Sequence, residues 1–303
     1  PPERRRPAGF DFVSISDHYH PWIDAQGHSG FVWAVLGAMA RATERIEIAV
    51  GVTCPTVRIH PAIIAQATAT TARLLPGRFV WGVGSGEALN EQILGDPWPP
   101  ADVRIEMLEE AVGVIRELWE GESVTHRGRY YTVVDARIYD PPPHRVPLMV
   151  SEFGPRAAEV AARIGDGLWV TGTDPEPIDL FIAAGGTGPV YSQLGLCWAA
   201  DTDAAVATVR KVWPNAVLPG QLSQDLRTPA HFEQAVEIVT DDMIRDAMPC
   251  GPDPAPVLDS VAAAVNAGVD HVYLHQIGPD QEGFLRFWAD EIAPEVAGYR
   301  DGD

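Results

Sequence analysis

Residues 79–91 read FVWGVGSGEALNE, an apolar run followed by a glycine-rich turn that carries the carboxylate of Glu87 and the amide of Asn90. Glycine allows positive φ and lets backbone N–H groups approach a ligand, and the residues after Glu87 can begin a helix. The pattern predicts a buried strand that delivers polar side chains to its carboxyl end. A solvated glutamate in an ordinary strand-to-helix turn is the alternative.

Apolar runs of strand length alternate with helical segments along the chain, which is typical of a parallel sheet with crossover helices. We predict an α/β fold, a (β/α)8 barrel in one domain over residues 1–303, with insertions at about 122–140, where a hairpin is expected, and at about 214–250. Its first βα unit is missing, and because an open barrel exposes two strand edges, we expect the natural chain to begin upstream. The seven expected strands lie at residues 12–16, 46–52, 79–83, 147–150, 168–170, 190–196 and 272–274.

Composition limits the classes of partner. The formal net charge of −20 and the isoelectric point near 4.7 oppose nonspecific binding to nucleic acid or anionic lipid. Cys54, Cys197 and Cys250 lie far apart without CxxC spacing, so neither a disulfide framework nor a cysteine zinc site is expected. No apolar run approaches the ~18 residues of a membrane span. We expect a small-molecule substrate and a cytoplasmic location, with no nucleic acid or membrane as partner.

The expected strand ends are unusually polar, and in barrels of this type the chemistry lies at the carboxyl ends of strands. Residues 17–22, after the first strand, read DHYHPW, and residues 51–56, at the end of the second, read GVTCPT. The histidines of the first segment, with neighbouring carboxylates, could bind a metal as in barrel hydrolases, but the other strands supply few further ligands, so we predict no metal. Cys54 is interpreted as a small packing residue near a ligand, with a nucleophile as the alternative.

Three ordered motifs, residues 16–22, 51–61 and 84–91, together resemble the bacterial luciferase-like superfamily, and most closely its branch that uses the 8-hydroxy-5-deazaflavin coenzyme F420. The resemblance runs from about residue 9 to the end of the chain. It implies a deazaflavin across the barrel mouth and hydride transfer to or from a small alcohol, carbonyl or enone. The alternatives are an FMN-dependent monooxygenase of the same superfamily, a metal-dependent barrel hydrolase and a noncatalytic ligand-binding relative. Members often dimerise through barrel helices, which makes a homodimer the default expectation.

The resemblance also implies individual roles. His18 and Glu87 match the pair that handles protons, with His18 as base and Glu87 as acid or with the roles exchanged, and Trp22 matches the aromatic residue that shields the reacting centre. The turn that receives the cofactor's phosphate precedes a helix, whose N-terminus favours an anion. The implied cofactor-binding residues are Asp17, Gly51 and Val52 (joined by a cis peptide bond in relatives), Cys54, Gly86, Asn90, and, in the phosphate turn, Phe153, Gly154, Arg156 and Ala157.

The chain departs from the sugar-phosphate dehydrogenases of this branch. Cys54 stands where they carry threonine, Asp174 falls where they carry a phosphate-binding lysine, and Asp270 falls near their phosphate-binding arginine. Arg245 aligns loosely with the remaining cation. Because carboxylates repel a phosphate dianion in a partly desolvated cleft, we expect a neutral alcohol, aldehyde, ketone or enone as substrate and not a sugar phosphate.

Overall fold

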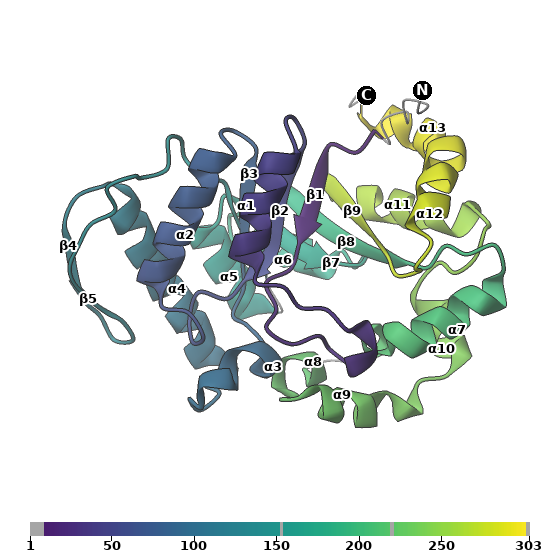
Figure 1. Ribbon diagram of the computed structural model, residues 1–303, viewed down its shortest axis with the longest axis horizontal. Helices are drawn as coiled ribbons and strands as arrows, with labels where there is room; N and C mark the ends of the chain where they lie inside the picture. The colour runs from purple at the N-terminus through teal and green to yellow at the C-terminus, as the bar shows by residue number, and fades with distance from the viewer. Residues whose placement is uncertain (1–8, 152–153, 219–220, 301–303) are drawn as a thin grey trace.

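Seven parallel strands form one sheet, in the order β1-β2-β3-β6-β7-β8-β9, which curls into a nearly closed barrel (Figure 1). The structure, a computed structural model, describes residues 9–151, 154–218 and 221–300. The predicted α/β barrel with seven visible strands is confirmed. The strands are β1 (Phe12–Ile15), β2 (Glu47–Thr53), β3 (Phe79–Val83), β6 (Leu148–Ser151), β7 (Gly167–Thr171), β8 (Val190–Leu196) and β9 (His271–Gln276).

Helices cover the outside of the barrel because its strands are buried on both faces. All five residues of β3 are buried, and Trp81 packs edge-on against Trp119 of an outer helix, with ring centroids 5.6 Å apart. No helix of the described part of the chain is long and apolar enough to cross a membrane. The outer helices are α1 (Val32–Ala42), α2 (Pro61–Leu74), α4 (Ala101–Trp119), α5 (Pro155–Ile164), α6 (Glu176–Ala183), α11 (Ala255–Asn266) and α12 (Gln281–Phe287).

Large aromatic side chains fill the barrel interior. Trp169 of β7 stacks on Tyr191 of β8 at 5.1 Å and lies tilted against Tyr273 of β9 at 5.3 Å. A Cβ atom added at Gly51 would overlap the Trp169 ring, which explains why β2 carries glycine where its peptide passes this ring. The interior at this level is therefore a packed layer of side chains and not a pore.

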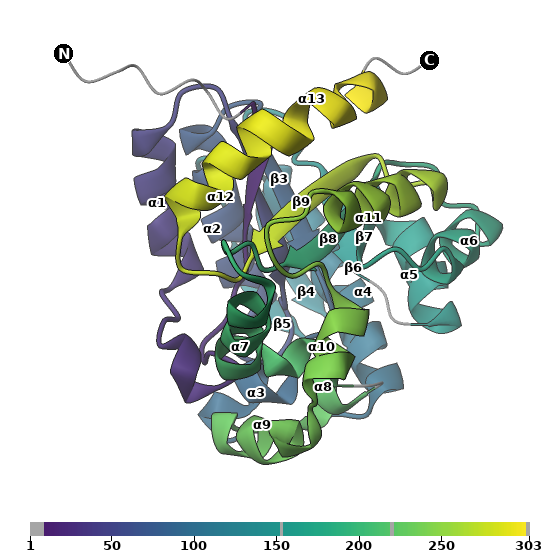
Figure 2. The same ribbon diagram turned by 90° about the vertical axis from the view of Figure 1, so that its right-hand side faces the viewer.

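The seam between β1 and β9 is closed by side chains. Within the described residues the two strands share no backbone pairing, but Phe12 of β1 makes edge contacts with His271 and Tyr273 of β9, at 6.1 and 6.2 Å. Just before β1, Phe10 stacks on Trp288 at 4.7 Å. Figure 2 shows α12 and the following α13 (Ala293–Val296) beside this end of β1.

The first predicted insertion contains the expected hairpin, β4 (Val124–Arg127) and β5 (Thr132–Ala136), which projects beyond α2 and α4 (Figure 1). The second contains short helices that lie with α3 (Ala88–Glu91) at the carboxyl ends of the strands, namely α8 (Leu222–Asp225), α9 (Pro229–Ala235) and α10 (Asp241–Ala247).

Arg104 of α4 attaches the second insertion to the barrel. Its side chain is buried, donates to the Pro99 carbonyl at 2.7 Å and to Gln224 Oε1 of α8 at 2.8 Å, and lies over the Trp98 ring. Trp98 in turn donates to Asp225 at 3.2 Å. These contacts hold the insertion over the barrel mouth.

Candidate active site

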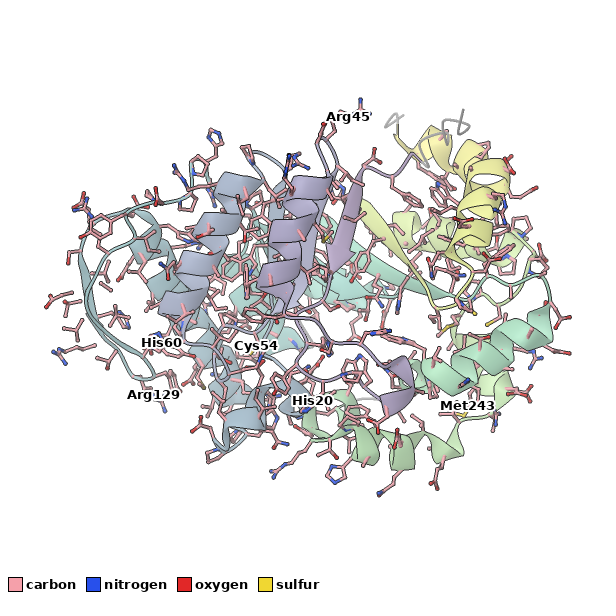
Figure 3. All side chains as sticks on the ribbon, viewed as in Figure 1. His20, Arg45, Cys54, His60, Arg129 and Met243 are labelled. Carbon is pink, nitrogen blue, oxygen red and sulfur yellow. The ribbon has the colours of Figure 1, made fainter. Side chains whose placement is uncertain are left out.

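The glycine-rich turn after β3 meets the loop after β1 at the mouth of the barrel. β3 ends at Val83, and the turn positions Glu87 as the residue that precedes α3. Figure 3 places Cys54, just after β2, and His20, in the loop after β1, at this end of the barrel, and Arg45 at the opposite end. The prediction that these strand ends converge is therefore confirmed by the geometry.

Asn90 connects the two segments. Its Oδ1 accepts hydrogen bonds from the backbone N–H groups of Tyr19 and His20, at 2.9 and 3.1 Å. Its Nδ2 lies 3.0 Å from Glu87 Oε2 and 3.0 Å from His18 Nδ1. Asn90 is buried, so these four contacts fix the loop after β1 against α3.

His18 and Glu87 form the predicted pair. The imidazole Nε2 lies 3.6 Å from Glu87 Oε2, and the two side chains are 21% and 28% exposed. Desolvation dominates both pKa values: it lowers the pKa of His18 to about 4 and raises that of Glu87 to about 8, where Glu91 adds repulsion between carboxylates. At neutral pH the imidazole is consequently uncharged and the Glu87 carboxyl is mostly protonated.

The hydrogen bonds of Asn90 also assign the tautomer of His18. Because Oδ1 accepts from two backbone N–H groups, the amide cannot turn over without facing donors with donors. Nδ2 then faces His18 Nδ1 at 3.0 Å, and the same Nδ1 lies 3.3 Å from the His20 carbonyl oxygen. The shorter contact favours Nδ1 as the acceptor, which puts the proton of the neutral imidazole on Nε2, on the side of Glu87.

Beneath this pair lies a buried ion network that the sequence did not reveal. The Arg58 guanidinium donates to Asp17 Oδ1 at 2.8 Å and to Glu91 Oε1 at 3.4 Å, and the Arg58 N–H donates to Glu91 Oε2 at 2.8 Å. The side chain of Arg58 is 6% exposed, and those of the two acids are each 1% exposed. Asp17 Oδ2 is buried without a hydrogen-bond partner among the described residues. Arg58 stands within the second sequence motif, but nothing in the motif shows which acids it meets.

Cys54 lies beside this network and does not have the properties of a nucleophile. Burial raises the pKa of its thiol well above the usual value, and its Sγ lies 2.9 Å from Thr56 Oγ1. Gly86 adopts a φ of 83°, and a Cβ there would press on the Cys54 sulfur. The peptide bond between Gly51 and Val52 is cis. Cys54 is therefore a buried packing residue against Gly86, in agreement with its interpretation from the sequence.

Trp22 lies between the ring of His18 and the second insertion. Its ring centroid is 5.0 Å from that of His18 and 5.0 Å from that of Phe232, which belongs to α9 of the second insertion. Phe232 is fully buried, and Asp24 of the same loop donates through its N–H to Glu233 at 3.2 Å. The insertion thus holds the aromatic cover in place.

The turn predicted to bind the phosphate lies only partly within the described residues. Phe153 lies outside the described residues, while Gly154 has a φ of 107° and precedes α5. Ala157 lines a small cavity of about 40 Å³ together with Ser85 and Ser151. Arg156, half exposed, pairs with Glu106 at 2.9 Å, so its charge is already partly balanced.

One of the two expectations about carboxylates at the mouth needs revision. Asp174 follows β7 and accepts from the Glu176 N–H at 3.0 Å, on the mouth side as expected. Asp270 instead precedes β9 and accepts from the Val190 N–H at 2.8 Å, at the opposite end of the barrel. The expected position of Asp270 near a phosphate site is therefore wrong, because the alignment placed it by sequence and not by strand direction.

The metal alternative finds no support in the described residues, where no group of three His, Cys, Asp or Glu side chains is placed to hold an ion. His18 Nδ1 accepts from Asn90, and His20 Nδ1 lies 2.9 Å from the Leu89 carbonyl oxygen. Asp17 is held by Arg58.

Comparisons with known proteins agree with this geometry. A family model described as luciferase-like monooxygenase matches residues 7–271. An F420-dependent glucose-6-phosphate dehydrogenase from Microbacterium testaceum is 37% identical over 301 residues, covering 95% of this chain and 89% of that protein. The enzyme of the same name from Intrasporangium calvum is 33% identical, covering 97% and 93%.

Among solved structures, an F420-dependent secondary alcohol dehydrogenase in complex with an F420-acetone adduct superimposes with a TM-score of 0.87 at 32% identity, covering 95% of this chain and 91% of that one. A coenzyme F420-dependent tetrahydromethanopterin reductase from Methanopyrus kandleri gives a TM-score of 0.74 at 22% identity, covering 95% and 92%, and shows the shared fold alone.

Proposed function

The chain belongs to the luciferase-like monooxygenase family, and on that premise we propose that it is an F420-dependent oxidoreductase that interconverts a neutral secondary alcohol and its ketone. The observation that carries the proposal is the hydrogen-bonded cluster of His18, Asn90 and Glu87. Its acid is protonated and its imidazole is neutral at neutral pH. Such a pair can exchange one proton with a substrate oxygen while a hydride moves elsewhere.

The mouth fits a polar heterocycle such as F420. A buried polar atom without a hydrogen-bond partner is costly, and the carboxylate oxygen Asp17 Oδ2 and the hydroxyl oxygen Thr53 Oγ1 are two such atoms in the described residues. Gly51 packs against the Trp169 ring and Gly86 against Cys54, so neither position has space for a side chain on that side. We propose that these positions, with Asn90, hold the ring system, and that Gly154, Arg156 and Ala157, with Phe153, bind the tail. When bound, F420 accepts a hydride from the alcohol or returns one to the ketone.

The structure favours an exchange of the two roles first assigned to the proton-handling pair. Because His18 Nδ1 accepts from Asn90, the neutral imidazole has no free lone pair with which to act as base. We therefore propose that His18 Nε2–H donates a hydrogen bond to the substrate oxygen and orients it. Glu87 takes the hydroxyl proton during oxidation and gives a proton to the carbonyl oxygen during reduction. Trp22 shields this exchange from water.

Charge at the mouth supports a neutral substrate. The sequence contains a single lysine, Lys211, which lies in the last turn of α7 (Thr202–Val212) and is exposed. Arg245, the loosely aligned cation, pairs with Asp203 at 2.6 Å, and Asp174 lies on the mouth side. A phosphate dianion would meet the Asp174 carboxylate there, while the charge of Arg245 is already balanced by Asp203.

The proposal is tested by titrating the protein with oxidised F420 and with FMN, then measuring turnover with 2-propanol and with glucose 6-phosphate. We expect micromolar or tighter binding of F420 and turnover of the alcohol. Binding of FMN without binding of F420 would sink the cofactor assignment. Turnover of glucose 6-phosphate at a kcat/KM above that of every neutral alcohol would sink the substrate assignment and leave the cofactor assignment standing.

A further inference from the structure

A second polar group lies at the barrel mouth, on β8 and β9, away from the proton-handling pair. A chain of hydrogen bonds rises to it through the barrel interior. Trp169 Nε1 donates to Tyr273 Oη at 3.0 Å, and Tyr273 Oη donates to Gln193 Oε1 at 2.9 Å. Gln193 Nε2 then lies 3.5 Å from His275 Nδ1. We call Trp169, Tyr273, Gln193 and His275 the interior relay.

The direction of every bond in the interior relay is set by its first member. The indole of Trp169 can only donate, so Tyr273 accepts with its oxygen and uses its own proton toward Gln193. Gln193 Oε1 is thereby the accepting atom, and its Nε2 faces His275. This contact is long, but it presents an N–H group to Nδ1 and so favours the tautomer that carries its proton on Nε2. Desolvation also lowers the pKa of His275, which keeps the ring uncharged near neutral pH.

The last atom of the relay is a donor without a protein acceptor. In the described chain, Nε2 of His275 has no hydrogen-bond partner, and the residue is only partly buried. Its ring packs edge-on against Trp213, with centroids 4.4 Å apart. A neutral N–H group is thus held in one orientation at the carboxyl end of β9, beside an aromatic wall.

This donor belongs to the same mouth as the proton-handling pair. Gln26, in the loop after β1, accepts from the Trp22 N–H at 2.8 Å and donates to Asn215 Oδ1 at 3.1 Å. Asn215 follows Trp213 by two residues. Gln26 therefore joins two segments. One is the loop that carries Trp22, which lies on His18, and the other is the segment that carries Trp213, which lies on His275.

We propose that His275 is a specificity-determining residue that donates from Nε2 to a second, uncharged oxygen of the substrate, with Gln193 as its positioning residue. The inference rests on the proposed alcohol–ketone activity and narrows its substrate class: a secondary alcohol or ketone that carries an ether, carbonyl or hydroxyl oxygen further along its chain. The site contributes no positive charge, because the relay holds the imidazole neutral, so it recognises a neutral acceptor and not a phosphate.

The test compares isosteric substrates in the F420-loaded enzyme, namely 4-methoxy-2-butanol with 2-hexanol and 5-methoxy-2-pentanol with 2-heptanol. A hydrogen bond to a neutral acceptor changes kcat/KM by about three- to tenfold. We expect at least one ether alcohol to exceed its alkanol by this factor, chiefly through KM. His275→Phe should bring the ratio to about one, and Gln193→Leu should lower it, because the imidazole tautomer is no longer fixed.

His271→Phe is the matched control, since it removes a histidine from the amino end of the same strand and should leave the ratio unchanged. Calorimetric binding of 5-methoxy-2-pentanone and 2-heptanone to the F420-loaded protein provides a readout without turnover. Absence of turnover with every alcohol would sink the proposed function, while the calorimetric ratio still decides the present inference. Equal affinities for the two ketones, no binding of either, or an unchanged ratio in His275→Phe would overturn it.

Discussion

The two polar groups at the barrel mouth are built in different ways. On the β1–β3 side, Glu87 and His18 are held by the loops that carry them, through Asn90, above a buried ion network. On the β8–β9 side, His275 is held from below by uncharged residues of the barrel interior. The first group has strongly shifted pKa values of opposite direction, and the second is a fixed neutral donor.

The difference separates reaction from recognition. A group that moves a proton needs a pKa near the working pH, which burial beside other carboxylates supplies for Glu87. A group that recognises a substrate oxygen needs a constant charge and direction, which the interior relay supplies for His275. Substitutions on the first side should therefore change rate and pH dependence, and those on the second should change substrate preference.

The largest expected effect follows removal of the titrating acid. Glu87→Gln keeps the shape of the side chain and an acceptor for Asn90 but cannot exchange a proton, so kcat/KM for alcohol oxidation should fall by about 10²–10⁴-fold. Steady-state kinetics with F420 at saturation measures this. Glu237→Gln, an exposed position in the second insertion, should leave kcat/KM unchanged. Full turnover by Glu87→Gln would remove this residue from the reaction.

The second effect is on stability. Arg58→Met leaves Asp17 and Glu91 buried without their shared cation, so the free energy of unfolding should fall by about 3–5 kcal/mol. Urea denaturation measures the change. The matched control is Arg163→Met, whose pair with Glu109 is about half exposed and should contribute less than about 1 kcal/mol. Equal losses of unfolding free energy in the two variants would show that the buried network stabilises the fold no more than an exposed ion pair does.

A smaller effect is expected from Asn90→Asp, which keeps the acceptor for the Tyr19 and His20 N–H groups but loses the donor to His18. The new carboxylate should move the imidazole proton to Nδ1 and raise its pKa. We expect kcat/KM to fall by about 10–10²-fold, with the His18 titration moved toward neutral pH, as measured by NMR of the imidazole protons. An unshifted His18 titration would contradict the tautomer assignment.

The sequence predicted the strands well where the apolar runs are continuous. β3 begins and ends at the expected residues because it is such a run. The short helix α6 is harder to read from the sequence, since it carries Pro177 in its first turn. Strand-end logic together with the family resemblance also predicted that His18, Glu87 and Trp22 meet.

What the sequence could not supply depends on register and packing in three dimensions. Arg58 binds two acids that come from different segments of the chain. The imidazole of His275 is oriented by Gln193 on the neighbouring strand. Asp270 was misplaced for the same reason, since its end of β9 cannot be read from an uncertain alignment. The roles of the cofactor-binding residues stay a prediction that ligand titrations must test.

The central claim is that Glu87, and not His18, exchanges the substrate proton. Its most direct test is the pH dependence of kcat/KM for alcohol oxidation between pH 5 and 10, which reports the essential groups of the enzyme before the alcohol binds. Oxidation requires the carboxylate, so kcat/KM should rise with pH through the Glu87 pKa of about 8, while ketone reduction should fall over the same range. A rate of oxidation that is flat across pH 8 and declines only toward the His18 pKa of about 4 would contradict the claim.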